Sequence, residues 1–250
     1  MKAELLNKVK RASKSVGLYP SLSRIWHRFS RYPERLEEER SFYEPFLKEG
    51  DLCFDVGANV GRKSQAFLEL GADVVAFEPQ PNCAEEIRLR CGPTEHLRIH
   101  NCAIGAEEAM AQLDVSTRSG LAQIISDSGG EETITVDVYP LNRFIEQYGM
   151  PKFCKIDVEG YELQVMKGLS QLPDALSFEY HATSPEKVDH ALACLKRIRS
   201  YGADVELNYT ERTNLHFQSA AWMSIEELER QLRNEWKQMP IFGDIFVKRT

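Results

Sequence analysis

Short apolar runs alternate with helix-like segments through the first half of the chain. Strand-like runs occupy residues 52–56, 73–77 and 97–104, and segments of helical character, 62–70 and 82–90, separate them. These runs are short and mostly apolar, and the first two are nearly continuously so, which is typical of strands buried on both faces. Alternation of strand and helix predicts a parallel sheet with helices on both sides.

The pattern changes after residue 104. Residues 111–115 and 133–138 alternate apolar and polar side chains, as strands with one exposed face do. The stretch 116–130 between them is rich in Ser, Gly and Asp. We expect a β-hairpin insertion here, whose loop is either plain surface or a lid over a substrate.

The strand and helix pattern then resumes. Further strands are predicted at 153–158, 175–180, 204–209 and 244–248, and further helices at 141–148, 161–169, 185–201 and 224–236. The whole pattern predicts an α/β Rossmann-like fold, with a mostly parallel seven-stranded sheet, helices on both faces and a β-hairpin insertion. We expect this domain to cover residues 49–250 and a helical N-terminal extension to cover 1–48.

Charge is distributed unevenly along the chain. The formal net charge is −7, yet residues 1–31 hold eight Lys and Arg against one Glu. The acidic remainder argues against nucleic-acid binding, which needs a basic surface. We interpret the basic segment as a helical cap on the domain, with contact to an anionic membrane surface or an acidic partner as the alternative. The sequence leaves the oligomeric state open.

The six cysteines lie apart and form no Cys-x-x-Cys motif. We therefore expect reduced thiols and a cytoplasmic protein. The sequence has no apolar run of about 18 residues, so a membrane-spanning helix is not expected. A secretory signal is not expected either.

The most informative motif is the glycine turn after the first apolar run. Residues 51–61 read Asp-Leu-Cys-Phe-Asp-Val-Gly-Ala-Asn-Val-Gly, and Glu78 ends the next apolar run. A strand, a tight turn at a helix start and an acid on the next strand suit a nucleoside-bearing cofactor, whose ribose the acid can hold. Asn59 stands where a dinucleotide turn has its second glycine. This favours a cofactor without phosphate, such as S-adenosylmethionine, over a nicotinamide dinucleotide.

Three blocks of the sequence resemble the FkbM-type S-adenosylmethionine-dependent methyltransferases. They are residues 52–61, Ala-Phe-Glu-Pro at 76–79, and Lys-Ile-Asp-Val-Glu-Gly at 155–160 with Met-Lys-Gly at 166–168. The resemblance implies a class I methyltransferase fold and O-methylation of a sugar or natural-product hydroxyl. By match to the family, the residues that contact the cofactor would be Asp55, Gly57, Ala58, Asn59, Gly61, Glu78, Asn101, Cys102 and Ala103.

Acids and a histidine at the ends of the fourth and fifth predicted strands are the catalytic candidates. They are Asp157, Glu159, Glu179 and His181. Methyl transfer is an in-line displacement in which the protein aligns the nucleophile, and an alcohol nucleophile benefits from a base. Residues two apart on a strand share a face, so each pair can act on one ligand. The alternatives are helix capping by an acid and a structural hydrogen bond for the histidine.

The same four side chains can instead hold a divalent cation, Mg²⁺ or Mn²⁺, that lowers the pKa of the acceptor hydroxyl. We favour a site without a metal. Lys155 lies inside the fourth strand and needs a carboxylate partner, expected on a neighbouring strand. Tyr209, Phe217 and Trp222 either stack on a sugar or pack in the core.

Together these features predict an S-adenosylmethionine-dependent O-methyltransferase that acts on a small-molecule hydroxyl acceptor. Two alternatives stay open. One is a nicotinamide-dependent oxidoreductase on a similar sheet, and the other is a non-catalytic binding module docked through the basic N-terminus.

Overall fold

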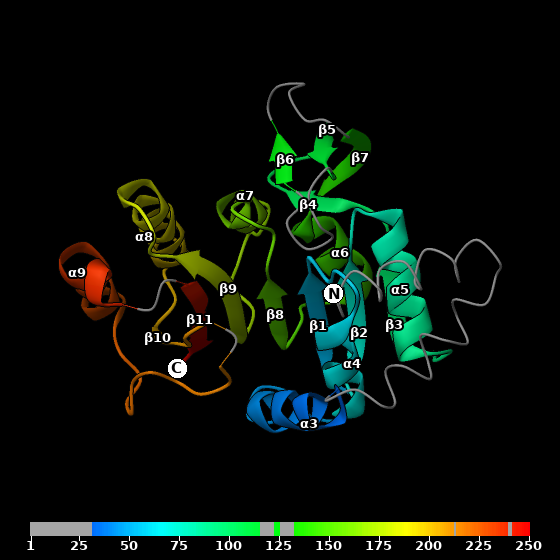
Figure 1. Cartoon of the computed structure of the whole chain (residues 1–250), viewed down its shortest axis with the longest axis horizontal. Helices are drawn as coiled ribbons and strands as arrows, with labels where there is room; N and C mark the ends of the chain where they lie inside the picture. The colour runs from blue at the N-terminus through cyan, green and yellow to red at the C-terminus, as the bar shows by residue number, and fades with distance from the viewer. Residues whose placement is uncertain (1–31, 116–122, 126–132, 213, 240–241) are drawn as a thin grey trace, which may run out of the picture.

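A central sheet with helices on both faces forms the body of the structure (Figure 1). The computed structural model describes residues 32–115, 123–125, 133–212, 214–239 and 242–250. Within these ranges, no helix is both long and apolar enough to cross a lipid bilayer. All six cysteines lie in the described part of the chain as free thiols.

The central sheet has seven strands in the order β10-β11-β9-β8-β1-β2-β3. Their bounds are β1 Leu52–Val56, β2 Asp73–Phe77, β3 Leu97–His100, β8 Phe153–Ile156, β9 Ala175–His181, β10 Val205–Tyr209 and β11 Phe242–Arg249. All neighbours run parallel except β11, which is antiparallel to both β9 and β10. The mostly parallel seven-stranded α/β sheet is therefore confirmed. The strand order reverses between β1 and β8, and open α/β sheets bind ligands at such a point.

Helices cover each face of the sheet. One face carries α3 Tyr32–Tyr43, α4 Arg62–Glu69 and α5 Pro81–Cys91, and the other carries α6 Leu141–Tyr148, α7 Glu162–Lys167, α8 Pro185–Arg199 and α9 Ile225–Glu235, which the 3₁₀ helix η1 Trp236–Gln238 follows. Alternate strand residues face the two layers. Phe54 and Phe178 pack under α6 to α9, whereas Cys53 and Phe246 pack under α3 and α4.

The insertion is larger than the predicted hairpin. β5 (Ala109–Asp114) and β7 (Thr133–Pro140) pair antiparallel and confirm the hairpin, while β4 (Ala103–Gly105) and β6 (Gln123–Ile125) extend it to a four-stranded sheet. The predicted strand 97–104 is therefore wrong in extent. The chain leaves the central sheet after His100, and residues 103–105 pair with β7 instead.

The predicted loop 116–130 is only partly described. β6 lies inside it, which the sequence pattern did not predict. The rest of the loop, and with it the prediction of a lid, lies outside the described residues.

The predicted N-terminal extension is described from residue 32 onward, and residues 1–31 lie outside the described part. α3 packs on α4. The carboxylate of Glu39 in α3 is fully buried and lies 2.9 Å from Nε of Arg62 and 3.3 Å from Nζ of Lys63. α3 is thus held to the helix that follows the glycine turn by charge as well as by apolar contact.

Aromatic rings fill the space between α3 and the sheet. The ring of Phe46 packs, tilted, against those of Phe153 and Phe246, with centroids 5.4 and 5.5 Å away. Phe217 and Trp222 lie 5.1 Å apart and pack against the same rings. Both are half-buried and pack against the core, as the core-packing interpretation of these two residues predicted.

Candidate active site

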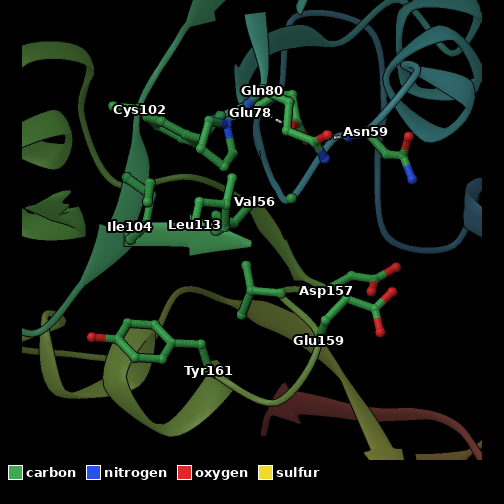
Figure 2. Close-up of a pocket in the computed structure, with 15 residues that line it drawn as sticks. Val56, Asn59, Glu78, Gln80, Cys102, Ile104, Leu113, Asp157, Glu159 and Tyr161 are labelled. Atoms are coloured by element: carbon green, nitrogen blue, oxygen red, sulfur yellow. Dashed lines mark hydrogen bonds between the residues drawn. The ribbon is translucent and has the colours of Figure 1, made fainter. Parts of the chain in front are cut away.

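A pocket opens at the carboxyl ends of β1, β2 and β8, beside the point where the strand order reverses (Figure 2). The second sheet closes one side of it through β4 and β5. The lining residues are Val56, Gly57, Asn59, Phe77, Glu78, Pro79, Gln80, Cys102, Ala103, Ile104, Leu113, Asp157, Val158, Glu159 and Tyr161.

The glycine turn after β1 forms one wall of the pocket. Gly57 has a φ of +79°, and a Cβ there would lie 1.8 Å from the carbonyl oxygen of Asp157, so only glycine fits. Asn59 has a φ of 51°, a left-handed conformation that asparagine tolerates. The N–H groups of Gly57 and Ala58 both donate to the carbonyl of Phe77 at 3.0 Å. The turn is thus fixed between β2 and the segment after β8.

Glu78 follows β2 directly and is 3% exposed. Its Oε2 accepts the N–H of Asn59 at 2.8 Å, and its Oε1 accepts the N–H of Gln80 at 2.9 Å. Burial raises the pKa of this carboxyl to about 7, although the two backbone donors oppose the rise. Each carboxylate oxygen has a second lone pair, so the ionised group can accept two further hydroxyl donors.

The structure divides the nine predicted cofactor residues into two groups. Gly57, Asn59, Glu78, Cys102 and Ala103 line the pocket together. The other four, Asp55, Ala58, Gly61 and Asn101, are not among the residues that line it.

Each of those four makes a structural contact instead. Asp55 is fully buried and accepts the Ser64 hydroxyl at 2.6 Å. Ala58 packs with Ile87 of α5, and a Cβ on Gly61 would also meet Ile87. Nδ2 of Asn101 donates to the carbonyl oxygen of Glu78 at 2.7 Å.

Sequence reasoning missed the apolar side of the pocket. Ile104 and Leu113 reach it from the second sheet, and Tyr161 from the segment before α7. No local pattern shows how the second sheet docks. Gln80 could have been found from the sequence, because it lies two residues after the predicted cofactor residue Glu78. In the structure its N–H donates to that carboxylate.

Asp157 borders the pocket and pairs with a buried lysine. Nζ of Lys155, a residue only 3% exposed, lies 2.7 Å from Oδ2 of Asp157. Burial lowers the pKa of this ammonium, but the charges of Asp157, Asp55 and Asp244 outweigh it and raise the pKa. The hydrogen-bonded partner is therefore on the same strand segment, while Asp55 on neighbouring β1 adds a second negative charge.

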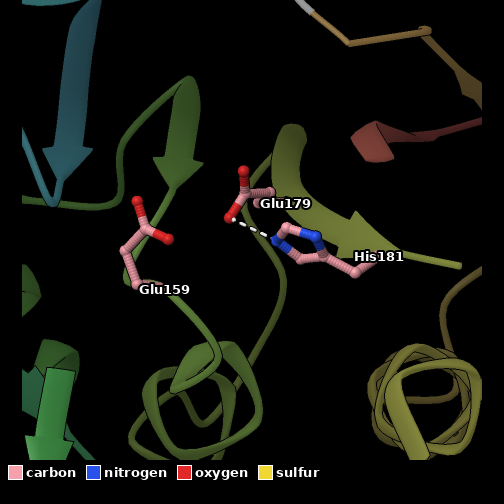
Figure 3. Close-up of side chains that lie close together, drawn as sticks. All are labelled: Glu159, Glu179 and His181. Carbon is pink, nitrogen blue, oxygen red and sulfur yellow. Dashed lines mark ion pairs between the residues drawn. The ribbon is translucent and has the colours of Figure 1, made fainter. Parts of the chain in front are cut away.

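Glu159, Glu179 and His181 form a second group beside the pocket (Figure 3). One donor atom of each lies within 4.8 Å of the other two. Nε2 of His181 is 3.2 Å from Oε2 of Glu179, and this ion pair raises the pKa of the imidazole. Burial, followed by the charges of Glu179 and Asp157, raises the pKa of Glu159 to about 7. Burial also raises the pKa of Glu179.

The helix-capping role considered for Asp157 and Glu159 is taken by another residue, Glu162. Oε1 of Glu162 accepts the N–H groups of Gly160 at 3.0 Å and of Val158 at 3.3 Å, so this side chain holds the segment before α7. Glu159 itself has a φ of 55°.

All four predicted catalytic side chains thus lie in the segments at the carboxyl ends of β8 and β9. Asp157 and Glu159 line the pocket, whereas Glu179 and His181 lie beside it, joined to it through Glu159. Such a set can accept a proton, orient a hydroxyl or bind a cation.

Comparisons with known proteins find related methyltransferases. The model of the methyltransferase FkbM domain matches residues 55–205. The hexuronic acid methyltransferase AglP of Haloferax volcanii is 26% identical over 156 residues, which cover 58% of this chain and 63% of that protein. The 2-O-methyltransferase NoeI of Sinorhizobium fredii is 24% identical over 173 residues, covering 61% of this chain and 71% of that protein.

Solved structures also superpose, with lower similarity. A precorrin-6y C5,15-methyltransferase from Geobacter metallireducens has 10% identity and a TM-score of 0.46, covering 85% of this chain and 88% of that one. A SAM-dependent O-methyltransferase from Thermotoga maritima has 13% identity and a TM-score of 0.42, covering 85% and 65%.

Proposed function

Because the chain belongs to the FkbM methyltransferase family, we propose that it is an O-methyltransferase that takes its methyl group from S-adenosylmethionine. The observation that carries the proposal is the pocket itself. A buried carboxylate, Glu78, and the glycine turn lie on one side of it, and the acids Asp157 and Glu159 lie on the other.

The residues of the pocket fit this cofactor. Glu78 has lone pairs left for the two ribose hydroxyls, and its backbone donors at 2.8 and 2.9 Å fix its orientation. The turn from Gly57 to Gly61 would take the methionine end. Cys102 and Ala103 would meet the adenine, beside the apolar side chains of Ile104 and Leu113. When bound, the cofactor supplies an electrophilic methyl group on a sulfonium.

The chain's own task at the reacting end is to align the acceptor hydroxyl and take its proton. We assign it to Asp157, Glu159, Glu179 and His181, which lie close together where β8 and β9 end. Lys155 holds the Asp157 carboxylate in place through the 2.7 Å contact.

The acceptor we propose is a sugar or a natural-product-like small molecule. Support comes from AglP and NoeI, whose names give a hexuronic acid methyltransferase and a 2-O-methyltransferase. The chain matches 63% of the length of AglP, so the acceptor is proposed by class only. We further propose that residues 49–250 form the catalytic domain, and that the protein works in the cytoplasm, where its six free thiols stay reduced.

Calorimetry with S-adenosylhomocysteine tests the cofactor. We expect saturable binding to the wild type, binding at least about tenfold weaker in Glu78→Ala, and unchanged binding in Glu108→Ala, whose carboxylate is 69% exposed. NAD should not bind. Equal affinity in Glu78→Ala and wild type would refute the assignment.

Turnover separates the reacting end from the cofactor end. His181→Ala and Asp157→Ala should keep the affinity for S-adenosylhomocysteine and lose methyl transfer. Unchanged turnover in both variants would rule out this set as the proton-accepting group.

A further inference from the structure

Glu159, Glu179 and His181 reach one spot from two neighbouring strand ends, as Figure 3 shows. We propose that these three side chains form a binding site for a divalent cation, with Mn²⁺ as its probe. The sequence alone favoured a site without metal, and three features of the folded chain argue for one.

The first feature is distance. Donor atoms that all lie within 4.8 Å of one another can share a single point about 2.8 Å or less from each. Divalent cations bind oxygen ligands at about 2.0–2.6 Å, so small side-chain rotations bring all three donors to one ion. One imidazole with two carboxylates is a donor set that first-row divalent cations such as Mn²⁺ accept.

The second feature is a buried carboxylate oxygen. Oε2 of Glu179 exposes less than 1 Å², and Nε2 of His181 lies 3.2 Å from it as an ion pair. A carboxylate oxygen has two lone pairs, so an ion can share this oxygen with the imidazole.

A second Glu–His pair elsewhere in the chain shows the contrast. Nε2 of His190 and Oε2 of Glu162 lie 2.9 Å apart in a hydrogen bond. The His190 and His181 side chains are equally exposed, at 29%. His190 is not part of any group of three possible metal ligands found among the described residues.

The third feature is the number of carboxylates gathered here. Glu159 lines the pocket together with Asp157, and a carboxylate oxygen of Glu179 lies within 4.8 Å of one of Glu159. The buried ammonium of Lys155 contacts Asp157, at 2.7 Å. A cation between the two glutamates would lower the repulsion between these carboxylates.

A role for the cation follows from Glu159, which also lines the pocket. Bound there, a cation would lower the pKa of an acceptor hydroxyl and orient it. Asp157, held by Lys155, would remain to take the proton. This role rests on the proposed methyl transfer, whereas the binding site does not.

The test is a titration of metal-stripped full-length protein with Mn²⁺, followed by electron paramagnetic resonance of the free ion. A pH near 8 keeps Glu159 ionised, because its pKa is about 7. We expect one saturable site in the wild type. Glu179→Gln and His181→Ala should each weaken Mn²⁺ binding at least about tenfold, and His190→Ala should match the wild type. Circular dichroism checks that each variant folds.

Two results would overturn the site: no saturable Mn²⁺ binding by the wild type, or the same affinity in His181→Ala as in the wild type. S-adenosylhomocysteine binding by the same variants is a separate readout and should not change. If Mn²⁺ binds and S-adenosylhomocysteine does not, the proposed function fails and the cation site stands.

Discussion

The glycine turn contacts the segment after β8, and adding one methyl group to Gly57 tests this contact. In Gly57→Ala the new Cβ would lie 1.8 Å from the carbonyl oxygen of Asp157 and 2.8 Å from its carbonyl carbon. These are backbone atoms, so the overlap can be relieved only by moving the turn away from Asp157. Gly50→Ala is a matched control, since Gly50 has a φ of +81° against +79°, and a Cβ added there would meet nothing within 4 Å.

The magnitude follows from comparing the two sites. A left-handed alanine costs about 1–2 kcal/mol, and the loss of glycine's freedom in the unfolded chain returns about 0.4–1 kcal/mol. Gly50→Ala should therefore lower the free energy of unfolding by about 1 kcal/mol. Gly57→Ala adds the cost of overpacking, about 1–3 kcal/mol, for a total of about 2–4 kcal/mol.

Urea unfolding followed by circular dichroism measures both losses. Calorimetry with S-adenosylhomocysteine on the folded variants should show weaker binding in Gly57→Ala only, because the displaced turn is part of the pocket wall. Equal destabilisation of the two variants would refute the argument, since it would mean that the turn and Asp157 are not in fixed contact.

Two further predictions concern buried charges. The pKa of Glu78 is about 7, so the affinity for S-adenosylhomocysteine should fall as the pH drops through 7, because protonation removes a hydrogen-bond acceptor. Calorimetry should find weaker binding in Glu78→Gln, and that binding should not depend on pH. Lys155→Met leaves the fully buried carboxylate of Asp55, as well as the half-buried one of Asp157, without its cation and should lower the free energy of unfolding by about 3–5 kcal/mol. The control Lys152→Met breaks an exposed pair with Asp174 and should cost about 0–1 kcal/mol in the same urea experiment; equal losses would contradict the assigned burial.

The central sheet could be predicted because each of its strands carries the signal locally. The run 74–77 is apolar on both faces, and Glu78 follows it at the edge where ligands bind. The same reasoning brought Glu159 and Glu179 together, since the carboxyl ends of parallel neighbours meet at one edge. These features follow from the order of the strands in the sequence and from the alternation of side chains along each strand.

The face that each polar residue takes could not be predicted in this way. Asp55 pairs in register with Lys155, which pairs with Ser177, so all three share the face under α3 and α4. This turns Asp55 away from the pocket, although it stands two residues before Gly57. The register between strands about a hundred residues apart decided the outcome, and no local pattern encodes it. The docking of the second sheet, which brings Ile104 to the pocket, could not be predicted for the same reason.

The position of β11 has a consequence for the order of folding. Among the described strands this strand comes last in the sequence, yet it lies between β9 and β10 and is the only described strand of the central sheet that pairs with β10. While the chain is being synthesised, β10 has no place in the sheet until residues 242–249 have emerged from the ribosome. Asp244, which pairs in register with Glu179, arrives with them. The edge of the sheet beside Glu179 is therefore completed last, after the β1–β2–β3 half has had time to form.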